Sequence, residues 1–206
     1  MDLDDWNKRY RLRERPAEDL DAAPTPLLVE TAAALAPGKA PRKALDLACG
    51  AGRNALWLAE RGWEVTAVDG AQAAIEILRT RAKERGLKIN AVVADLEKGE
   101  FEIEPSRWDL VAMCYYLQRN LFEPAKRGVA PGGILISIVH MTEPGEEDGP
   151  HRLRPGELEQ YFAGWEILHR YEGKANDSAH RRAVAEIVAR RPWGVVVTQR
   201  DNATSS

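Results

Sequence analysis

The sequence of 206 residues has few cysteines, no long apolar run and no excess of positive charge. Its two cysteines, Cys49 and Cys114, are too few for a disulfide framework, and we expect both to be small core residues in a reducing compartment. No stretch approaches the roughly 20 apolar residues that a membrane helix needs. The first twenty residues also lack the apolar run of a signal peptide. We therefore expect a cytoplasmic protein with no membrane partner.

The charge balance and the spacing of the histidines argue against two further classes of function. The formal net charge is −3 at pH 7, so no basic surplus favours binding to nucleic acid. His151, His169 and His180 do not show the spacing of metal ligands. We predict neither a nucleic-acid partner nor a bound metal.

Short apolar runs alternate with helical periods through the middle of the chain. From Ala71 to Ala82, apolar residues recur every three or four positions, as on one face of a helix. Alternation of strands and helices with short connections predicts βαβ units and a parallel sheet with helices on both faces. The expected strands are 44–48, 63–68, 89–93, 108–113 and 134–139, and the expected helices are 54–61, 71–85 and 121–129.

The two ends of the chain differ from this alternating core. Residues 1–38 are expected to form a helical appendage, with a short helix within 2–22 and a second one over 27–35. Beyond His140 we expect an acidic loop (141–150), a short helix (155–162) and two strands (165–171 and 183–189) joined by a polar hairpin (172–182). We expect the loop to be a mobile rim whose acids disfavour a strongly anionic ligand. The whole chain, 1–206, is predicted to be one domain with its core over 39–200.

The most informative segment is a strand that runs into a glycine turn, Asp46-Leu47-Ala48-Cys49-Gly50-Ala51-Gly52. Glycines let the backbone approach a ligand closely, and the helix that follows offers unpaired N–H groups at its start. Asp69 ends the next strand, where an aspartate can accept hydrogen bonds from both hydroxyls of a ribose. This pattern predicts a cofactor that contains a nucleoside, bound at the carboxyl edge of the sheet.

Two cofactor classes fit the glycine turn. Residues 50–55 satisfy the G-x-G-x-x-G/A pattern of dinucleotide sites, so a nicotinamide-dependent reductase is one alternative. Against it, Asp46 lies inside the strand, where a carboxylate suits an ammonium group better than a pyrophosphate. Asp95, after the third strand, is placed to reach an adenine amino group, and little chain remains for a separate substrate domain.

Residues 46–52 resemble the first motif of the class I methyltransferases, D/E-x-G-x-G-x-G, with Ala48 at the first glycine. The later motifs of that class correspond to Asp69, 94–96, 108–111 and 131–133, so the resemblance covers about 43–140. Within the class, the segments 50–54 and 156–166 are similar to the tellurite-resistance and thiol methyltransferase-like group.

The resemblance implies a doubly wound α/β fold with a mostly parallel seven-stranded sheet, in the order 3-2-1-4-5-7-6 with the last strand antiparallel. It also implies S-adenosylmethionine as the cofactor, with Asp69 at the ribose and Asp95 at the adenine. The candidate cofactor-binding residues are Asp46, Gly50, Gly52, Arg53, Asn54, Asp69, Gly70, Asp95, Leu96, Cys114 and Tyr115, with Trp6 and Tyr10 as an N-terminal lid.

Several of these residues also have an ordinary structural interpretation. Asp69 and Asn54 are possible helix caps, Asp95 a possible turn residue, and Arg53 a possible solvent-exposed side chain. Trp6 and Tyr10 would then simply pack on the core.

Methyl transfer to a small molecule is the predicted activity, with Tyr115, Tyr116 and His140 as the candidate catalytic residues. Because none of them is a compelling base, we expect a soft acceptor such as a thiol, a chalcogen or an arsenic species. The alternatives are a metabolite or natural-product O/N-methyltransferase and a non-catalytic, regulatory protein that binds S-adenosylmethionine. We expect a monomer or a homodimer.

Overall fold

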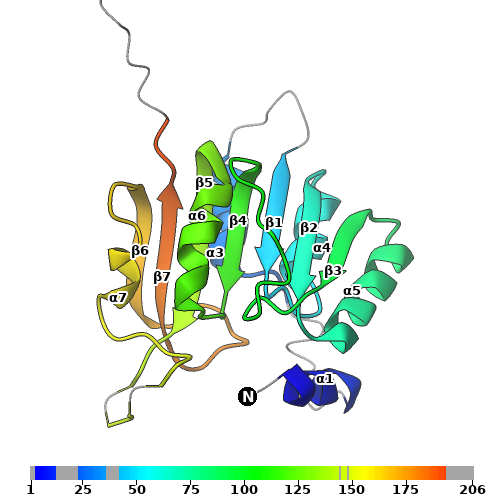
Figure 1. Cartoon of the computed structure of the whole chain (residues 1–206), viewed down its shortest axis with the longest axis horizontal. Helices are drawn as coiled ribbons and strands as arrows, with labels where there is room; N and C mark the ends of the chain where they lie inside the picture. The colour runs from blue at the N-terminus through cyan, green and yellow to red at the C-terminus, as the bar shows by residue number, and fades with distance from the viewer. Residues whose placement is uncertain (1–2, 13–22, 36–41, 144, 148, 194–206) are drawn as a thin grey trace, which may run out of the picture.

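A computed structural model describes residues 3–12, 23–35, 42–143, 145–147 and 149–193, and its centre is one seven-stranded sheet (Figure 1). The strand order is β3-β2-β1-β4-β5-β7-β6. Strands β1 to β5 run parallel, and β7 is antiparallel to both of its neighbours. The predicted order and the antiparallel seventh strand are confirmed. The strands are β1 (Lys43–Leu47), β2 (Glu64–Asp69), β3 (Ile89–Val93), β4 (Trp108–Cys114), β5 (Val129–His140), β6 (Glu166–Lys174) and β7 (Ala183–Arg190).

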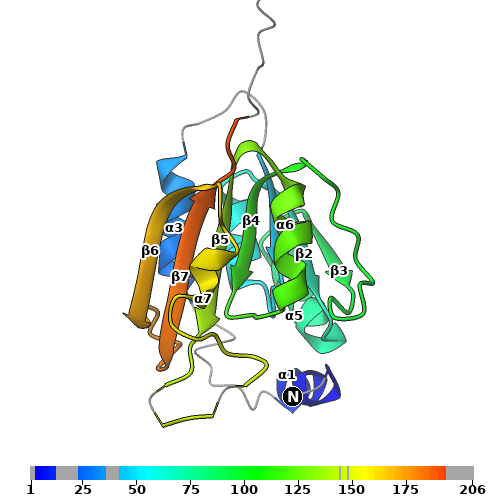
Figure 2. The same ribbon diagram turned by 60° about the vertical axis from the view of Figure 1, so that its left-hand side comes forward.

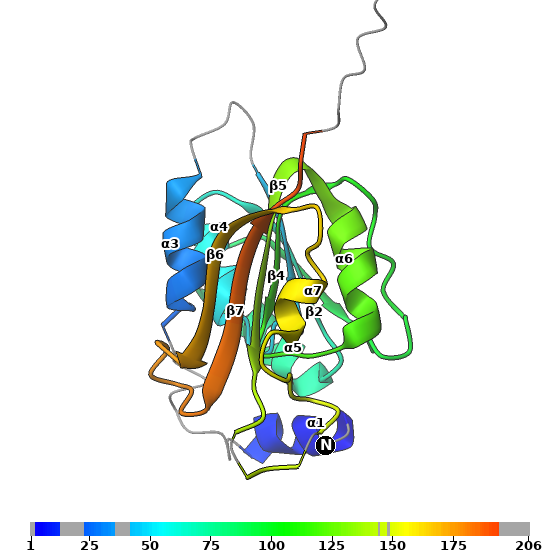
Figure 3. The ribbon, with the colours of Figure 1, turned by 90° about the vertical axis from the view of Figure 1, so that its left-hand side faces the viewer.

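Helices cover both faces of this sheet, as expected. Figure 3 shows α3 and α4 on one face and α6 and α7 on the other. In α5 the buried residues Ala74, Ile75, Leu78 and Ala82 follow the helical period that the sequence shows. Among the described residues, no helix is long and apolar enough to span a membrane. The helices are α1 (Leu3–Leu12), α3 (Pro26–Ala34), α4 (Arg53–Glu60), α5 (Gln72–Glu84), the 3-10 turn η1 (Arg119–Leu121), α6 (Phe122–Gly128) and α7 (Glu157–Gln160).

Each face of the sheet has its own apolar core. One core joins the sheet to α3, α4 and α5, and the other joins it to α6 and the α7 region. In the second core, the fully buried ring of Phe122 stacks on Tyr161 with 4.2 Å between ring centroids. Burial of such a ring contributes about 1.5–3 kcal/mol. This packing fixes the segment that follows the carboxyl end of β5.

Strand β5 is longer than predicted. We expected a turn at 131–133 and a strand only from Ile134, but β5 begins at Val129. The reason is tertiary: the N–H of Gly132 donates to the carbonyl of Arg191 at 3.0 Å, and the N–H of Arg191 donates to Gly133 at 2.9 Å. The segment after β7 therefore extends the sheet along residues whose composition favours a turn.

Loops from many parts of the chain meet at the carboxyl edge of the parallel strands. The connections after β1, β2, β4 and β5 leave the sheet there, and the β6–β7 hairpin returns to the same edge because β7 is antiparallel. Figures 1 and 2 show α1 lying beyond this edge, close to the start of α5. Ligands of open α/β sheets bind at such an edge, so the candidate site is sought here.

Candidate functional site

The glycine turn after β1 has the backbone conformation that its sequence predicts. Gly50 and Gly52 have φ values of 55° and 83°, in the left-handed region. A Cβ placed on Gly52 would stand 2.3 Å from the side chain of Leu78, so a larger residue would have to displace that side chain. Ala48, which replaces the first glycine of the motif, is also left-handed at φ 53°. For an alanine this conformation costs about 1–2 kcal/mol.

Asp69 holds this turn in place. Its Oδ2 accepts the N–H of Gly50 and its Oδ1 accepts the N–H of Ala71 at the start of α5, both at 2.8 Å. A carboxylate has about four lone-pair sites, so it retains acceptor capacity beyond these two hydrogen bonds. The role at the helix start and a role toward ribose hydroxyls are therefore compatible.

Asp46 is a buried carboxylate, only 2% exposed, at the carboxyl end of β1. Its Oδ2 has no hydrogen-bond partner within the described part of the chain. Burial raises the pKa of Asp46 to about 7, although the charge of Arg53 lowers it. A cationic group bound at the glycine turn would satisfy this oxygen, whereas a pyrophosphate would be repelled. The residues present therefore fit the ammonium group of S-adenosylmethionine.

One interpretation of the sequence made Arg53, the first residue of α4, a solvent-exposed side chain. The structure contradicts that interpretation. The guanidinium of Arg53 donates to the carboxylate of Asp177 at 2.7 Å, and the two side chains are only 13% and 7% exposed. The hydroxyl of Tyr115 donates to the same oxygen of Asp177 at 3.0 Å. The sequence analysis missed Asp177, and the polar character of the 172–182 hairpin was its only signal.

Three aromatic rings stand together at the ends of β4, β5 and the hairpin. Tyr115, with a left-handed φ of 62°, stacks on His180 with 3.3 Å between centroids, and His140 lies 5.4 Å from Tyr115. Burial raises the pKa of Tyr115 well above its usual range, so it is a neutral hydrogen-bond donor. Burial and the charge of Arg182 lower the pKa of His140, which leaves its imidazole uncharged at neutral pH.

The other candidate catalytic residue, Tyr116, is engaged elsewhere. Its hydroxyl donates to Gln118 at 2.8 Å, and the Gln118 amide donates to the carbonyl of Leu96 at 3.0 Å. Asp95 is a turn residue: its Oδ1 accepts the N–H groups of Glu97 and Lys98. A contact of Asp95 or Leu96 with adenine stays a prediction.

Asn54 does not cap α4, which corrects one of its two predicted roles. The N-cap is Gly52, with no side-chain hydrogen bond, and Asn54 is buried inside the helix. Its Oδ1 accepts the N–H of Thr25 at 2.9 Å and so ties the start of α3 to α4. Cys49 and Cys114 are both free thiols. Burial raises the pKa of Cys114 to about 12, which excludes a thiolate there at neutral pH.

Helix α1 lies against the glycine turn and the start of α5. The side chain of Asn7 accepts the N–H of Ala73 at 3.0 Å. The hydroxyl of Tyr10 is 2.6 Å from the point where a Cβ on Gly50 would stand. Trp6 is 6.4 Å from Tyr10 between ring centroids. This position suits a lid over the turn, and the lid itself stays a prediction.

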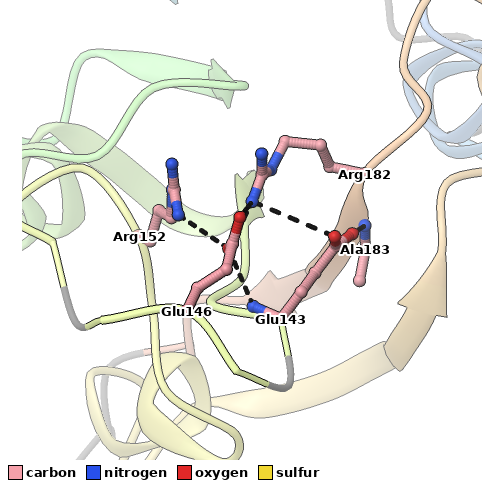
Figure 4. Close-up of polar contacts among 5 residues, drawn as sticks. All are labelled: Glu143, Glu146, Arg152, Arg182 and Ala183. Carbon is pink, nitrogen blue, oxygen red and sulfur yellow. Dashed lines mark hydrogen bonds and ion pairs between the residues drawn. The ribbon is translucent and has the colours of Figure 1, made fainter.

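The loop at 141–150, which we call the rim loop, contacts the β6–β7 hairpin through charges (Figure 4). The carboxylate of Glu146 forms ion pairs with Arg152, at 2.7 Å, and with Arg182. Glu143 accepts the N–H of Ala183 at 3.0 Å. Arg182 also lies 4.0 Å from the carboxylate of Glu143. Arginines thus pair with two acids that were expected to disfavour an anionic ligand, and the rim carries positive as well as negative charge.

Known methyltransferases are similar to this chain in sequence and in fold. Residues 44–133 match the family described as "Methyltransferase domain". The probable S-adenosyl-L-methionine-dependent methyltransferase TehB of Haemophilus influenzae is 26% identical over 62% of this chain and 47% of its own. Its crystal structure has a TM-score of 0.66 at 23% identity and covers 80% of this chain and 61% of that one.

Two further proteins are similar over much of the chain. The 2-heptyl-1-hydroxyquinolin-4(1H)-one methyltransferase of Mycobacteroides abscessus is 32% identical over 60% of this chain and 58% of its own. A structure described as "Conversion of a Disulfide Bond into a Thioacetal Group during Echinomycin Biosynthesis" has a TM-score of 0.70 at 23% identity, over 93% of this chain and 94% of that one. The chain spans about half the length of the curated relatives that it matches.

The matched segment begins in β1 and contains the glycine turn, Asp69 and Asp95. The strand order agrees with that match and differs from the order of a dinucleotide-binding sheet. The buried carboxylate of Asp46, with one oxygen that lacks a hydrogen-bond partner among the described residues, suits a cation better than a pyrophosphate. Residues 44–133 therefore match the methyltransferase domain family, and the chain is similar in sequence and in fold to TehB, a probable S-adenosyl-L-methionine-dependent methyltransferase.

Proposed function

We propose that this protein transfers the methyl group of S-adenosylmethionine to a small-molecule acceptor at the carboxyl edge of the sheet. The observation that carries the proposal is Asp46, a buried carboxylate with an unsatisfied oxygen beside the glycine turn. In this proposal Asp46 faces the ammonium group, Asp69 holds the ribose, and Asp95 with Leu96 borders the adenine. The bound cofactor supplies an already activated methyl group. The chain has to position the acceptor and exclude water.

The ionisation of the groups near Tyr115 favours an acceptor that needs no base. Tyr115 stays neutral, as does the thiol of Cys114. Despite its burial, the ion pair with Arg53 holds the pKa of Asp177 below its usual range, so this carboxylate is a weak base. A thiolate or a chalcogen or arsenic anion already carries the electron pair that attacks the methyl group. Arg182, at the rim, is compatible with such an anion.

A second candidate is methyl transfer to a hydroxyl or phenol, because His140 offers one neutral base. Its Nδ1 has no hydrogen-bond partner among the residues described, and its ring lies 5.4 Å from Tyr115. The Mycobacteroides abscessus relative is named as a methyltransferase of a hydroxyquinolone. Loss of turnover in His140→Gln, with unchanged cofactor affinity, would favour this second candidate.

The test has two stages on the purified full chain. Calorimetry first compares S-adenosylmethionine, S-adenosylhomocysteine and NAD, and we expect heat from the first two only. A methyl-transfer panel then compares small thiols, tellurite, selenite and arsenite with phenols and amines. Turnover of phenols or amines alone would overturn the soft acceptor. Cofactor binding without any turnover would instead support a regulatory protein.

A further inference from the structure

The ion pair between Arg53 and Asp177 joins two parts of the chain that are 124 residues apart. Arg53 is the first residue of α4, directly after the glycine turn, and Asp177 lies in the β6–β7 hairpin. Both side chains are nearly buried, at 13% and 7% exposed. A buried cation of this kind requires its counter-charge, because removing one partner leaves an uncompensated charge.

The charge of Arg53 also acts on the side of the site where the cofactor is proposed to bind. It lowers the pKa of Asp46, the carboxylate at the end of β1, against the effect of burial. Its guanidinium also lies 5.4 Å from the ring of Tyr115. Arg53 thus contacts the Tyr115 ring on the side proposed for the acceptor, and its charge acts on the carboxylate proposed for the cofactor's ammonium group.

The methyl donor and its product differ in charge at one atom. S-adenosylmethionine carries a positive sulfonium, whereas S-adenosylhomocysteine has a neutral thioether in its place. An unbalanced guanidinium next to the glycine turn would repel the donor more strongly than the product, because only the donor carries the sulfonium charge in addition to the ammonium group that both share. A carboxylate paired with Arg53 cancels that repulsion.

We propose that Asp177 is a positioning residue that neutralises Arg53 and so allows the site to hold a cationic methyl donor. The inference rests on the proposed function. It adds a residue that sets how tightly the site binds S-adenosylmethionine relative to S-adenosylhomocysteine. Asp177 acts through Arg53 and through the hydroxyl of Tyr115, which donates to the same carboxylate oxygen. A hairpin that contributes no residue to the matched methyltransferase segment would thereby control how the cofactor binds.

The size of the effect follows from Coulomb's law. One uncompensated charge within about 10 Å, at an effective dielectric constant of about 20, changes affinity by about tenfold. A purely structural tie between hairpin and helix predicts something else: its loss would weaken binding of donor and product by the same factor. The ratio of the two dissociation constants therefore separates the electrostatic role from the structural one.

The experiment measures the dissociation constants of S-adenosylmethionine and S-adenosylhomocysteine by calorimetry on the full chain. For Asp177→Asn we expect the donor to lose about tenfold more affinity than the product. Asp177→Glu should keep most of the wild-type ratio. The double variant Arg53→Met with Asp177→Asn should restore the ratio, because it removes the charge that Asp177 balances. Glu186→Gln, which removes an equally buried carboxylate of β7, is the matched control and should leave the ratio unchanged.

Equal losses for donor and product in Asp177→Asn would overturn the proposal, and so would an unchanged ratio. If Asp177→Asn does not fold, the double variant decides: a ratio that differs from the wild type would contradict the inference. Wild-type protein that binds neither compound refutes the proposed function itself. Wild-type binding of both, with no shift in the variants, refutes only the role of Asp177.

Discussion

At the scale of single residues, Asp46 and Asp69 are two carboxylates of one site that differ in how far their oxygens are hydrogen-bonded. Asp69 already accepts two backbone N–H groups, while one oxygen of Asp46 has no partner among the residues described. Burial without compensation raises the pKa of Asp46 to about 7, far above the usual value of 3.8. The two side chains should therefore respond differently to pH and to substitution.

Cofactor binding should depend on the ionisation of Asp46. Its raised pKa stabilises the ligand-free fold below about pH 4, and this contribution is lost as the pH rises to 7. An ammonium ligand favours the ionised carboxylate, so binding should release a proton below pH 7, and affinity should increase from pH 6 to pH 8. Calorimetry with S-adenosylhomocysteine at pH 6.5, in two buffers with different ionisation heats, measures that proton. Asp46→Asn should abolish its release, and equal affinities at pH 6 and pH 8 would contradict the prediction.

Replacement of Asp69 should affect binding and stability together. Asp69→Ala removes the acceptor of the Gly50 and Ala71 N–H groups as well as the proposed ribose contact. We expect cofactor affinity to fall by about 1.5–3 kcal/mol and the melting temperature to fall with it. Asp109→Asn is the control, because Asp109 accepts the Lys43 N–H at the opposite edge of the sheet. Full affinity in Asp69→Ala would mean that this carboxylate serves the turn alone.

At the scale of elements, sequence patterns predicted those helices and turns that depend on neighbouring residues. The period of α5 and the glycine turn after β1 are legible in the sequence because apolar spacing and backbone freedom are properties of neighbouring residues. The start of β5 and the partner of Arg53 were not predictable in this way. Both depend on the approach of distant segments, at Arg191 and Asp177, which no pattern near Gly132 or Arg53 reveals.

The rim loop should be held to the hairpin mainly by Glu146. Its ion pair with Arg182 joins the loop to the hairpin, and its ion pair with Arg152 joins it to the segment that follows the loop. Hydrogen bonding to Arg182 lowers the pKa of Glu146. Glu146→Gln should therefore speed hydrogen exchange at the amides of Leu153 and Ala183, and high salt should do the same in the wild type. The pairing should also weaken as the pH falls through the lowered pKa of Glu146.

The control for the rim loop is Glu123→Gln, which breaks an exposed ion pair with Lys126 on α6. It should leave exchange at Leu153 and Ala183 unchanged. If Glu146→Gln exchanges at the wild-type rate in both positions, the ion pairs do not restrain the loop.

At the scale of the whole molecule, the candidate site gathers residues from most of the chain. Asp46, Asp69, Tyr115, His140 and Asp177 come from four strand ends and one hairpin of a single sheet. Unfolding of that sheet removes all of them from the site at once. Stability and ligand binding should therefore be linked.

S-adenosylhomocysteine should raise the melting temperature substantially. A ligand that binds only the folded state adds about 2.7 kcal/mol at a hundred times its dissociation constant. For a chain of this length that corresponds to about 5–10 °C. NAD at the same concentration should give no shift, and Asp69→Ala should reduce the shift from S-adenosylhomocysteine. A shift from NAD as large as that from S-adenosylhomocysteine would be incompatible with the cofactor assignment.

The strand order also has a consequence for synthesis on the ribosome. β7 lies between β5 and β6, although it is made after both, and it is the partner through which β6 joins the sheet. Until Ala183 and the residues after it emerge, the nascent chain presents the whole hydrogen-bonding edge of β5 beside its buried residues Ile136 and Ile138. Such an edge is a template for pairing with other chains. Chains interrupted before Ala183 should therefore aggregate, and only translation through β7 closes the sheet.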